Sequence, residues 1–329
     1  MSRESSASAG GGSRLARAFS LAVSIVAVAA VVIWATKQDP PTLPTDTGEL
    51  LALIAAVAVV GVAAALRSER WMMLLRREGG APRRLDAYAI YAVGFMGNTV
   101  VPARGGDVLR VYLMAPRADL GLRNVIGTLI AERLLDVAFL LGLFAALAYF
   151  VLPGIDAPDS RYLGIAIASM TLAVVAGAVL LWRARDRSWA QRVIEFVRPM
   201  LLATARLRGR HGAAMVGMTA VTWFADAAVY LLAARSVGLS IDPLEALYGI
   251  GVAGVFLLIP SGPAYAGTFD AGVLFGARAI GARGGEAVSF VIMLRLIIFL
   301  PMVLAGLLAY LVRYRTQPDH DVLARGPAR

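Results

Sequence analysis

Long apolar runs alternate with short polar segments along most of the chain. Eight runs stand out. Four carry no charge, namely 18–36, 50–66, 87–103 and 162–182. Four others carry one or a few charges, namely 124–151, 212–234, 246–277 and 287–312. Each uncharged run is close to the ~20 residues that a helix needs to cross ~30 Å of hydrocarbon. The pattern predicts an all-α, polytopic membrane protein with about six full crossings and two interrupted segments.

Composition supports the same class. Apolar residues make up 59% of the chain and charged residues 16%, whereas a soluble domain has roughly 45–50% and ~25%. There is no cysteine, and the two histidines, His211 and His320, lie in polar segments. These absences argue against disulfides, thiolate chemistry and zinc sites, so we expect no cofactor and no metal.

The net charge of +10 is explained by where the basic residues lie. They concentrate in five segments, with three before residue 18, six in 67–84, four in 104–123, eight in 183–210 and four after 312. The positive-inside rule then places both termini and these segments in the cytoplasm of a plasma-membrane protein. Because this distribution accounts for the charge, we expect membrane lipids rather than nucleic acid as partners.

The charge distribution also predicts two hairpins. The run 87–103 has basic segments at both ends, and the run 246–277 has flanks that are poor in basic residues. We therefore expect hairpins at 87–115 and 246–277 that enter the membrane from opposite faces, with tips buried in protein. Glycine and proline permit such turns, and the residues expected to shape them are Pro102, Gly105, Gly106, Pro260, Gly262, Pro263 and Gly267.

The order of segments repeats. A helix, a broken hairpin and a long helix follow one another in 48–151 and again in 212–312. We expect one transmembrane domain over 18–312, with cytoplasmic tails at 1–17 and 313–329. Inverted repeats with interrupted segments at matching positions indicate a transporter-like fold whose substrate site lies near the midplane.

Charged residues at bilayer depth mark the candidate site in the first repeat. Arg104, Asp107 and Arg110 are spaced i, i+3 and i+6, so the aspartate can pair with either arginine. Glu132 and Asp136 share a face of the next helix, beside Arg133. Such charges normally face the interior of a bundle and pair there, so the sequence predicts a cation-rich pocket.

The second hairpin has fewer polar groups. They are Ser261, Thr268 and Asp270, and Arg295 on the following helix is the expected partner of Asp270 or Asp226. With Asn98 and the charged residues of the first repeat, these residues are the predicted substrate-binding set. Within it, Arg104, Arg110, Arg133 and Arg295 form a predicted ladder of cationic stations for an anionic headgroup.

A purely structural interpretation stands beside this one. The cluster Arg104, Asp107 and Arg110 can serve only to close its hairpin, because buried charge networks also occur without ligands. The cluster at 132–136 can equally lock its helix. Asn98 suits the bonding of hairpin backbone better than contact with a substrate.

Three sequence motifs carry a family resemblance. "NTVVPARGGDVLR" contains Asn98, Pro102, Arg104, Gly106, Asp107 and Arg110, "ERLLD" contains Glu132, Arg133 and Asp136, and "PAYAGTFD" contains Pro263, Gly267 and Asp270 ahead of Arg295. The chain resembles the flippase-like transmembrane region of the lysylphosphatidylglycerol synthases in its stand-alone form. It departs from the family pattern at Asp107 and Asp270, where glutamate is expected.

The resemblance implies movement of an anionic phospholipid or lipid-linked headgroup between leaflets. In the synthases this region accompanies a soluble aminoacyl-transfer domain, and we expect no lipid aminoacylation by this chain. Two other functions stay open. One is an intramembrane lipid-modifying enzyme using Glu132 or Asp136 as a base, although the chain has no H-E-x-x-H or G-x-S-x-G motif. The other is a transporter of small anionic solutes.

Overall fold

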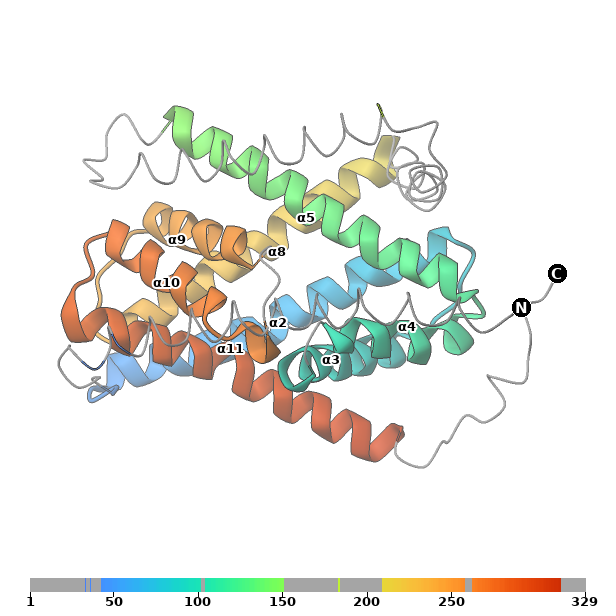
Figure 1. Cartoon of the computed structure of the whole chain (residues 1–329), viewed down its shortest axis with the longest axis horizontal. Coiled ribbons are helices and arrows are strands. Elements are labelled where there is room, and N and C mark those ends of the chain that lie inside the picture. Colours follow the sequence, from blue (N-terminus) through green and yellow to red (C-terminus); the bar gives the residue numbers. More distant parts are fainter. Residues whose placement is uncertain are drawn as a thin grey trace, which may run out of the picture.

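The structure is a computed structural model that describes residues 43–101, 104–150, 209–257 and 262–314, with the single residues 33, 36 and 183. All elements in this part of the chain are helical, and none is a strand, which confirms the predicted all-α class. In order they are α2 (Thr47–Arg77), α3 (Arg84–Val100), α4 (Gly105–Ala118), α5 (Leu122–Phe150), α8 (Gly209–Arg235), α9 (Pro243–Phe256), η2 (Pro263–Tyr265), α10 (Thr268–Ala279) and α11 (Gly284–Arg313) (Figure 1).

Several predictions fall outside the described residues. They concern the runs 18–36 and 162–182, the two tails except Arg313 and Tyr314, most of the basic segment 183–210, and the single residues Pro102, Pro260 and Ser261.

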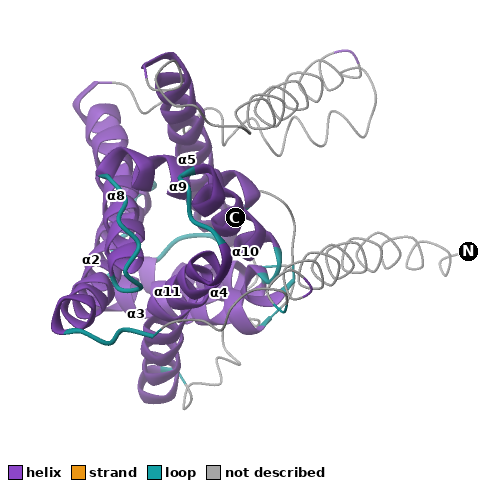
Figure 2. Cartoon of the chain, turned by 90° about the vertical axis from the view of Figure 1, so that its left-hand side faces the viewer, coloured by secondary structure: helices purple, strands orange, loops and turns teal. Residues whose placement is uncertain are grey.

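The described helices follow the predicted order twice. α2, α3, α4 and α5 form one series of long, short, short and long helices, and α8, α9, α10 and α11 form the second. In Figure 1, α9 and α10 lie in the left part of the bundle and α3 and α4 in the right part. α2 and α8, the first helices of the two series, pack side by side, as Figure 2 shows from a second direction.

Helix length separates two kinds of element. Among the described residues, α2, α8 and α11 are long and apolar enough to cross a membrane. The hairpin helices have 17, 14, 14 and 12 residues, which is about 18–26 Å at 1.5 Å per residue and less than the ~30 Å of hydrocarbon. Three of these helices are therefore too short for a full crossing, and α3 is at the lower limit.

The prediction that the helix of the run 50–66 ends at residue 66 is wrong. The charges from residue 67 onward suggested a loop over 67–84, but α2 continues to Arg77. The physical reason is that Arg67 and Arg70 find acidic partners on neighbouring helices. Paired charges do not need to leave the bundle.

The first hairpin is held together by close backbone contact. A Cβ on Gly106 would lie 1.9 Å from the carbonyl oxygen of Gly94, and one on Gly97 would lie 2.7 Å from the Cα of Gly106. The chain reverses at Arg104, which has a left-handed conformation with φ 57°. Gly105 packs against Val101 at the same turn.

Close backbone contact also holds the second hairpin together. Asp242 and Glu245 form a capping box that starts α9. A Cβ on Gly272 would lie 3.0 Å from the Cα of Ala253, and one on Gly276 would lie 3.1 Å from Gly249. The connection contains Gly262, Pro263 in the short helix η2, and Gly267 with φ 82°.

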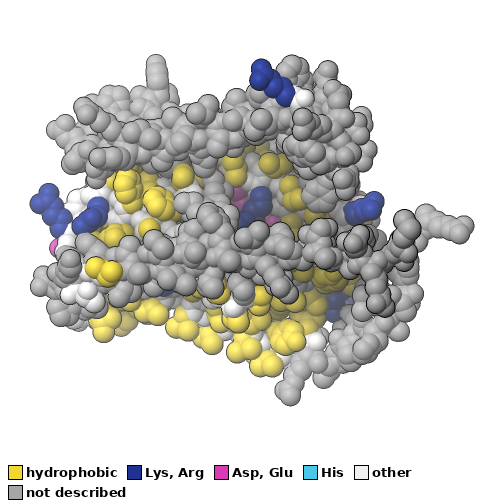
Figure 3. Space-filling view, viewed as in Figure 1, with side chains coloured by type: hydrophobic (Ala, Val, Ile, Leu, Met, Phe, Trp, Pro, Cys, Tyr) yellow, Lys and Arg dark blue, Asp and Glu magenta, His cyan; other side chains and the backbone are white. Residues whose placement is uncertain are grey.

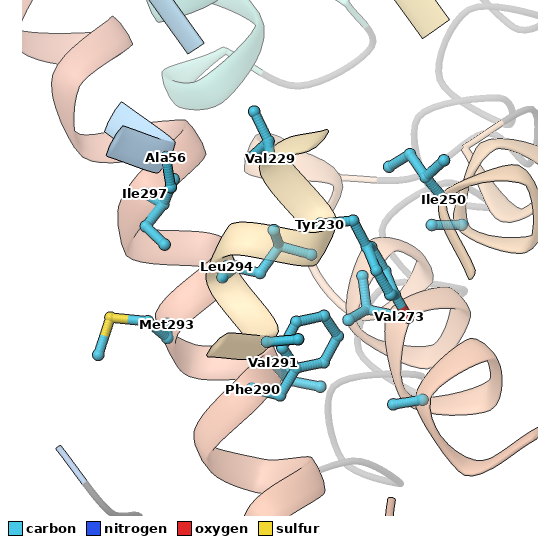
Figure 4. Close-up of a cluster of buried hydrophobic side chains, with 14 of the residues drawn as sticks. Ala56, Val229, Tyr230, Ile250, Val273, Phe290, Val291, Met293, Leu294 and Ile297 are labelled. Atoms are coloured by element: carbon cyan, nitrogen blue, oxygen red, sulfur yellow. The ribbon is translucent and has the colours of Figure 1, made fainter. Parts of the chain in front are cut away.

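The main core lies where α8, α10 and α11 meet (Figure 4). Tyr230 packs edge to face on Phe290 with ring centroids 4.7 Å apart. Val273, Leu294 and Ile297 complete this cluster and are almost wholly buried.

The outer surface is also apolar. Leu296, Leu300, Leu304 and Leu308 recur every four residues on α11 and are exposed. Figure 3 shows hydrophobic side chains along the edge where α11 runs in Figure 1. An exposed stripe of this length marks a surface for lipid or another apolar partner.

Candidate functional site

A charge network in the bundle interior centres on Arg70 of α2, whose side chain is 0% exposed. It donates to both oxygens of Asp136 at 2.6 and 3.1 Å and to Oε1 of Glu132 at 3.1 Å. It also donates to Oγ1 of Thr219 on α8 at 3.0 Å. Arg70 therefore joins α2, α5 and α8 at one point.

Glu132 is shared between two arginines. Its Oε2 accepts from Arg110 of α4 at 3.2 Å, and both side chains are at most 3% exposed. The guanidinium of Arg110 also lies over the rings of Trp71 at 4.2 Å and Tyr91 at 5.0 Å. Such contacts stabilise a desolvated cation, and with both oxygens occupied Glu132 has a structural role in this state.

Asn98 and Asp107 bond each other across the first hairpin. The Asn98 amide donates to the Asp107 carboxylate at 3.1 Å, and its oxygen accepts from the Asp107 backbone N–H at 3.1 Å. Arg110 adds a longer contact of 3.9 Å to Asp107. Asn98 thus bonds hairpin backbone, as the structural interpretation predicts.

Arg133 is in a different environment. Its side chain is 46% exposed, and its ion-pair contact to Asp136 is 3.9 Å long. The charged or polar groups within electrostatic range are those of Glu132, Asp107, Asp136 and Tyr265. Arg133 is therefore an accessible cation beside the acidic residues of the network, and Figure 3 shows basic and acidic side chains together near the centre of the face.

The tips of the two hairpins meet. Nη2 of Arg104 donates to the backbone carbonyl of Leu257 at 3.0 Å, and its guanidinium lies 5.9 Å from the ring centre of Tyr265. The left-handed backbone at Arg104 directs this side chain to the other hairpin, so Asp107 pairs with Arg110. Among the described residues Arg104 bonds a carbonyl oxygen and no carboxylate.

The second series of helices contains a tighter ion pair. Arg295 donates to both oxygens of Asp270 at 2.6 and 2.8 Å, and to the carbonyl of Ala264 at 3.4 Å. The rings of Phe269 and Phe299 lie 5.5 and 5.1 Å from its guanidinium. Of the two partners predicted for Arg295, the structure therefore selects Asp270.

The remaining predicted residues have local roles. Asp226 pairs with Arg67 of α2. Asp270 also accepts from the backbone N–H of Gly267 at 2.9 Å, which caps α10. Thr268 donates to the carbonyl of Tyr265 at 3.2 Å. In the described ranges no three His, Asp or Glu side chains are grouped as a metal site would require.

The family can now be assigned. Residues 17–306 match the family described as the lysylphosphatidylglycerol synthase TM region. The chain belongs to this family. The match confirms the resemblance seen in the motifs and extends over most of the chain.

Similarity to an individual named protein is more distant than the match to the family. Glycosyltransferase AglD of Haloferax volcanii is 23% identical over 292 residues, a match that covers 75% of this chain and 46% of that protein. The chain therefore spans less than half of this relative. No solved structure matches the chain.

The structure gives unequal positions to the family motif residues. Glu132 and Arg110 are buried in the network, whereas Arg133 is accessible and Arg104 lies where the hairpin tips meet. Whether any of these residues binds substrate stays a prediction.

Sequence reasoning missed four members of the network: Arg67, Arg70, Trp71 and Thr219. One signal was available, because Arg67 and Arg70 follow an apolar run directly, at i and i+3, with no helix-stopping residue between. Their partners lie 62 to 159 residues away in sequence and could not be found from spacing.

Proposed function

We propose that the protein transports an anionic phospholipid or a lipid-linked anionic headgroup between membrane leaflets. The observation that carries this proposal is the state of Arg133. It is an accessible guanidinium inside the helix bundle, next to the hairpin tips, with one long ion-pair contact among the described residues. A phosphate is the group that planar guanidinium donors bind best.

Depth supports a transport role. Arg133 is the twelfth residue of α5, so it lies about 16 Å along the helix from its start at 1.5 Å per residue. If α5 enters the membrane at its first turn, this is near the middle of ~30 Å of hydrocarbon. A charge at that depth costs at least ~2.5–3.5 kcal/mol on insertion scales and is usually functional. If the two hairpins enter from opposite faces, as the charge distribution predicts, their tips meet at this same depth.

Comparison with the other arginines reduces the number of residues that we propose as headgroup ligands. Arg110 is buried against Glu132 and two aromatic rings, which suits a structural role. Arg104 bonds only a carbonyl oxygen among the described residues, so it has donors left for an anion. Arg133 and Arg104 are therefore the proposed headgroup ligands in this state, with Arg295 as a further station.

The same contacts weigh against an intramembrane enzyme. A general base needs a free carboxylate oxygen near the substrate proton. Both oxygens of Glu132 and both oxygens of Asp136 receive hydrogen bonds from arginine. Each of these four oxygens is therefore already engaged by an arginine in this state.

The similarity to a protein named as a glycosyltransferase favours one substrate class among the candidates. Glycosyltransferases at membranes can act on lipid-linked saccharides, so we include an anionic lipid-linked saccharide as a proposed cargo beside an ordinary phospholipid. Both share the phosphate that Arg133 would bind.

Leaflet exchange in liposomes tests the proposal. The parent and Arg133→Gln are compared with fluorescent phosphatidylglycerol, phosphatidylcholine and a phosphate-linked glycolipid. We expect at least tenfold slower exchange of the anionic lipids in the variant, because a charge-assisted hydrogen bond contributes about 1.5–3 kcal/mol. Arg84→Gln is the matched control, since that side chain is 69% exposed and pairs only at the surface.

Three outcomes would contradict the proposal. Full exchange by Arg133→Gln would return Arg133 to a structural role. Equal loss for phosphatidylcholine would indicate gating instead of headgroup binding. Uptake of inorganic phosphate without lipid exchange would support a solute transporter.

A further inference from the structure

Two Asp/Arg pairs occupy the same positions in the two repeats. Asp107 is the third residue of α4 and Asp270 the third residue of α10. Arg133 is the twelfth residue of α5 and Arg295 the twelfth residue of α11. Each repeat thus offers an aspartate at the start of its second hairpin helix and an arginine in the long helix that follows.

The two pairs are in different states. Asp270 and Arg295 are joined by two hydrogen bonds of 2.6 and 2.8 Å. Asp107 bonds Asn98 and contacts Arg110 instead, and Arg133 is accessible, with 46% of its side chain exposed. The ion pair Asp270–Arg295 is therefore formed, which we call closed, and the ion pair Asp107–Arg133 is not formed, which we call open.

The helix contacts differ in a matching way. We call the contact between α3 and α11 the α3–α11 seam and the contact between α5 and α9 the α5–α9 seam. A two-fold relationship between the repeats would place each seam on the other. The α3–α11 seam is closely packed over much of its length, whereas α5 and α9 contact each other far less extensively.

Particular residues show the difference. In the α3–α11 seam, Phe95 and Phe299 have ring centroids 5.6 Å apart, and a Cβ on Gly306 would lie 2.4 Å from the carbonyl oxygen of Ala92. In the α5–α9 seam the buried contact is made by Leu140 with Tyr248 and Val252. The arginine of the open pair lies on a helix of the loose seam, and the arginine of the closed pair lies on a helix of the tight seam.

We infer that the two seams are lateral portals for the hydrocarbon chains of an anionic amphiphile, and that the pairs Asp107–Arg133 and Asp270–Arg295 are the latches that close them in alternation. The inference deepens the proposed function and rests on it. The anionic group of the ligand binds the released arginine while its chains occupy the open seam and stay in contact with lipid.

Charge balance suits this exchange. When the ligand anion replaces an aspartate on the arginine, the aspartate needs another partner, because an unpaired buried charge is costly. Asp107 already has Asn98 and Arg110 in this role, and Asp270 keeps the backbone N–H of Gly267. A rocking of the two repeats about their contact would close one latch as it opens the other.

An amphiphile fits better than a soluble anion. The accessible cation lies on α5 beside a loosely packed seam, and the exposed leucines of α11 give the bundle an apolar outer surface. A closed solute cavity would need both seams packed, as the α3–α11 seam is.

Distances between spin labels test the inference directly, since the chain has no native cysteine. One labelled pair spans the α3–α11 seam at the exposed residues Val100 and Leu300, and the other spans the α5–α9 seam at Leu134 and Leu244. In lipid nanodiscs, Asp270→Asn should add a longer-distance population across the α3–α11 seam and narrow the distribution across the α5–α9 seam. Arg295→Lys, which keeps the charge but loses the bidentate contact, should shift both in the same direction.

Glu69→Gln is the control, because Glu69 joins α2 to α3 through an ion pair with Arg84 and a hydrogen bond from the Tyr88 hydroxyl and belongs to neither seam, so both distributions should stay unchanged. Nanodiscs of phosphatidylglycerol should shift the seam populations relative to phosphatidylcholine. A shift caused by inorganic phosphate alone would assign the site to a soluble anion and overturn the amphiphile. Unchanged distances in folded Asp270→Asn and Arg295→Lys, checked by their melting, would overturn the latches.

The two proposals fail separately. If Arg133→Gln exchanges lipid normally while the distances across the seams change in Asp270→Asn, the proposed function is refuted and the seams are mobile for another reason. Lost exchange with static seams would keep headgroup binding and remove the portals.

Discussion

Arg70 and Glu132 lie 3.1 Å apart in the interior of the bundle, where their side chains are 0% and 2% exposed. Neither residue could be buried alone, because an isolated ion in a low-dielectric interior costs several kcal/mol. The pair, with Arg110 and Asp136, therefore fixes how α2, α4 and α5 pack. The pair lies next in the fold to the accessible Arg133 and is not itself open to a ligand.

Arg70→Leu should be strongly destabilising. It leaves Asp136 without its closest partner and Glu132 with one arginine, and breaking a buried pair costs about 3–5 kcal/mol. Reversible unfolding in mild detergent measures the loss. Arg84→Leu, at an exposed site, should change the free energy of unfolding by no more than ~0.5 kcal/mol. Equal stability of the two variants would show that water reaches Arg70.

Gly106→Ala should disrupt the first hairpin. The added methyl group would lie 1.9 Å from the carbonyl oxygen of Gly94, so the helices must separate, and overpacking of this kind costs about 1–3 kcal/mol or more. Gly127→Ala in α5 is the matched control, because nothing lies within 4 Å of the new Cβ. That control should be neutral or stabilising by up to ~1 kcal/mol, and melting temperatures of both proteins in detergent will decide.

Asn98→Ala should loosen the hairpin tip. It removes two part-buried hydrogen bonds to Asp107, each of which contributes about 0.5–1.5 kcal/mol. Hydrogen exchange at the start of α4 should become faster. Thr99→Val provides the comparison, since Thr99 bonds only the carbonyl of Phe95 in its own helix, and a similar effect there would argue that Asn98 has no special role.

Topology has its own test. Ser188, in the basic segment outside the described residues, should be cytoplasmic by the positive-inside rule. Ser188→Cys should resist an impermeant thiol reagent added to intact cells and react after the membrane is opened. Ser240→Cys, in the exposed connection before α9, should react from outside. The reverse labelling pattern would invert the orientation.

Sequence alone predicted the order of helices and the two breaks, because glycine, proline and the end of apolar periodicity are local signals. It placed Asp270 with Arg295 as one of two options, since both lie in the same repeat. It could not find Arg70 or Arg67, whose charges looked like the end of a crossing helix. Their burial depends on acids from α5 and α8, and only the folded bundle brings those acids close.

The contact between Arg104 and the carbonyl of Leu257 has a consequence for how the family can vary. The acceptor is a main-chain atom, so almost any side chain at position 257 leaves it in place, and that position can drift during evolution. Arg104 has no such freedom, because a shorter or uncharged side chain cannot reach across to the other hairpin. Homologues should therefore retain an arginine at 104 opposite a variable residue at 257, with no covariation between the two positions.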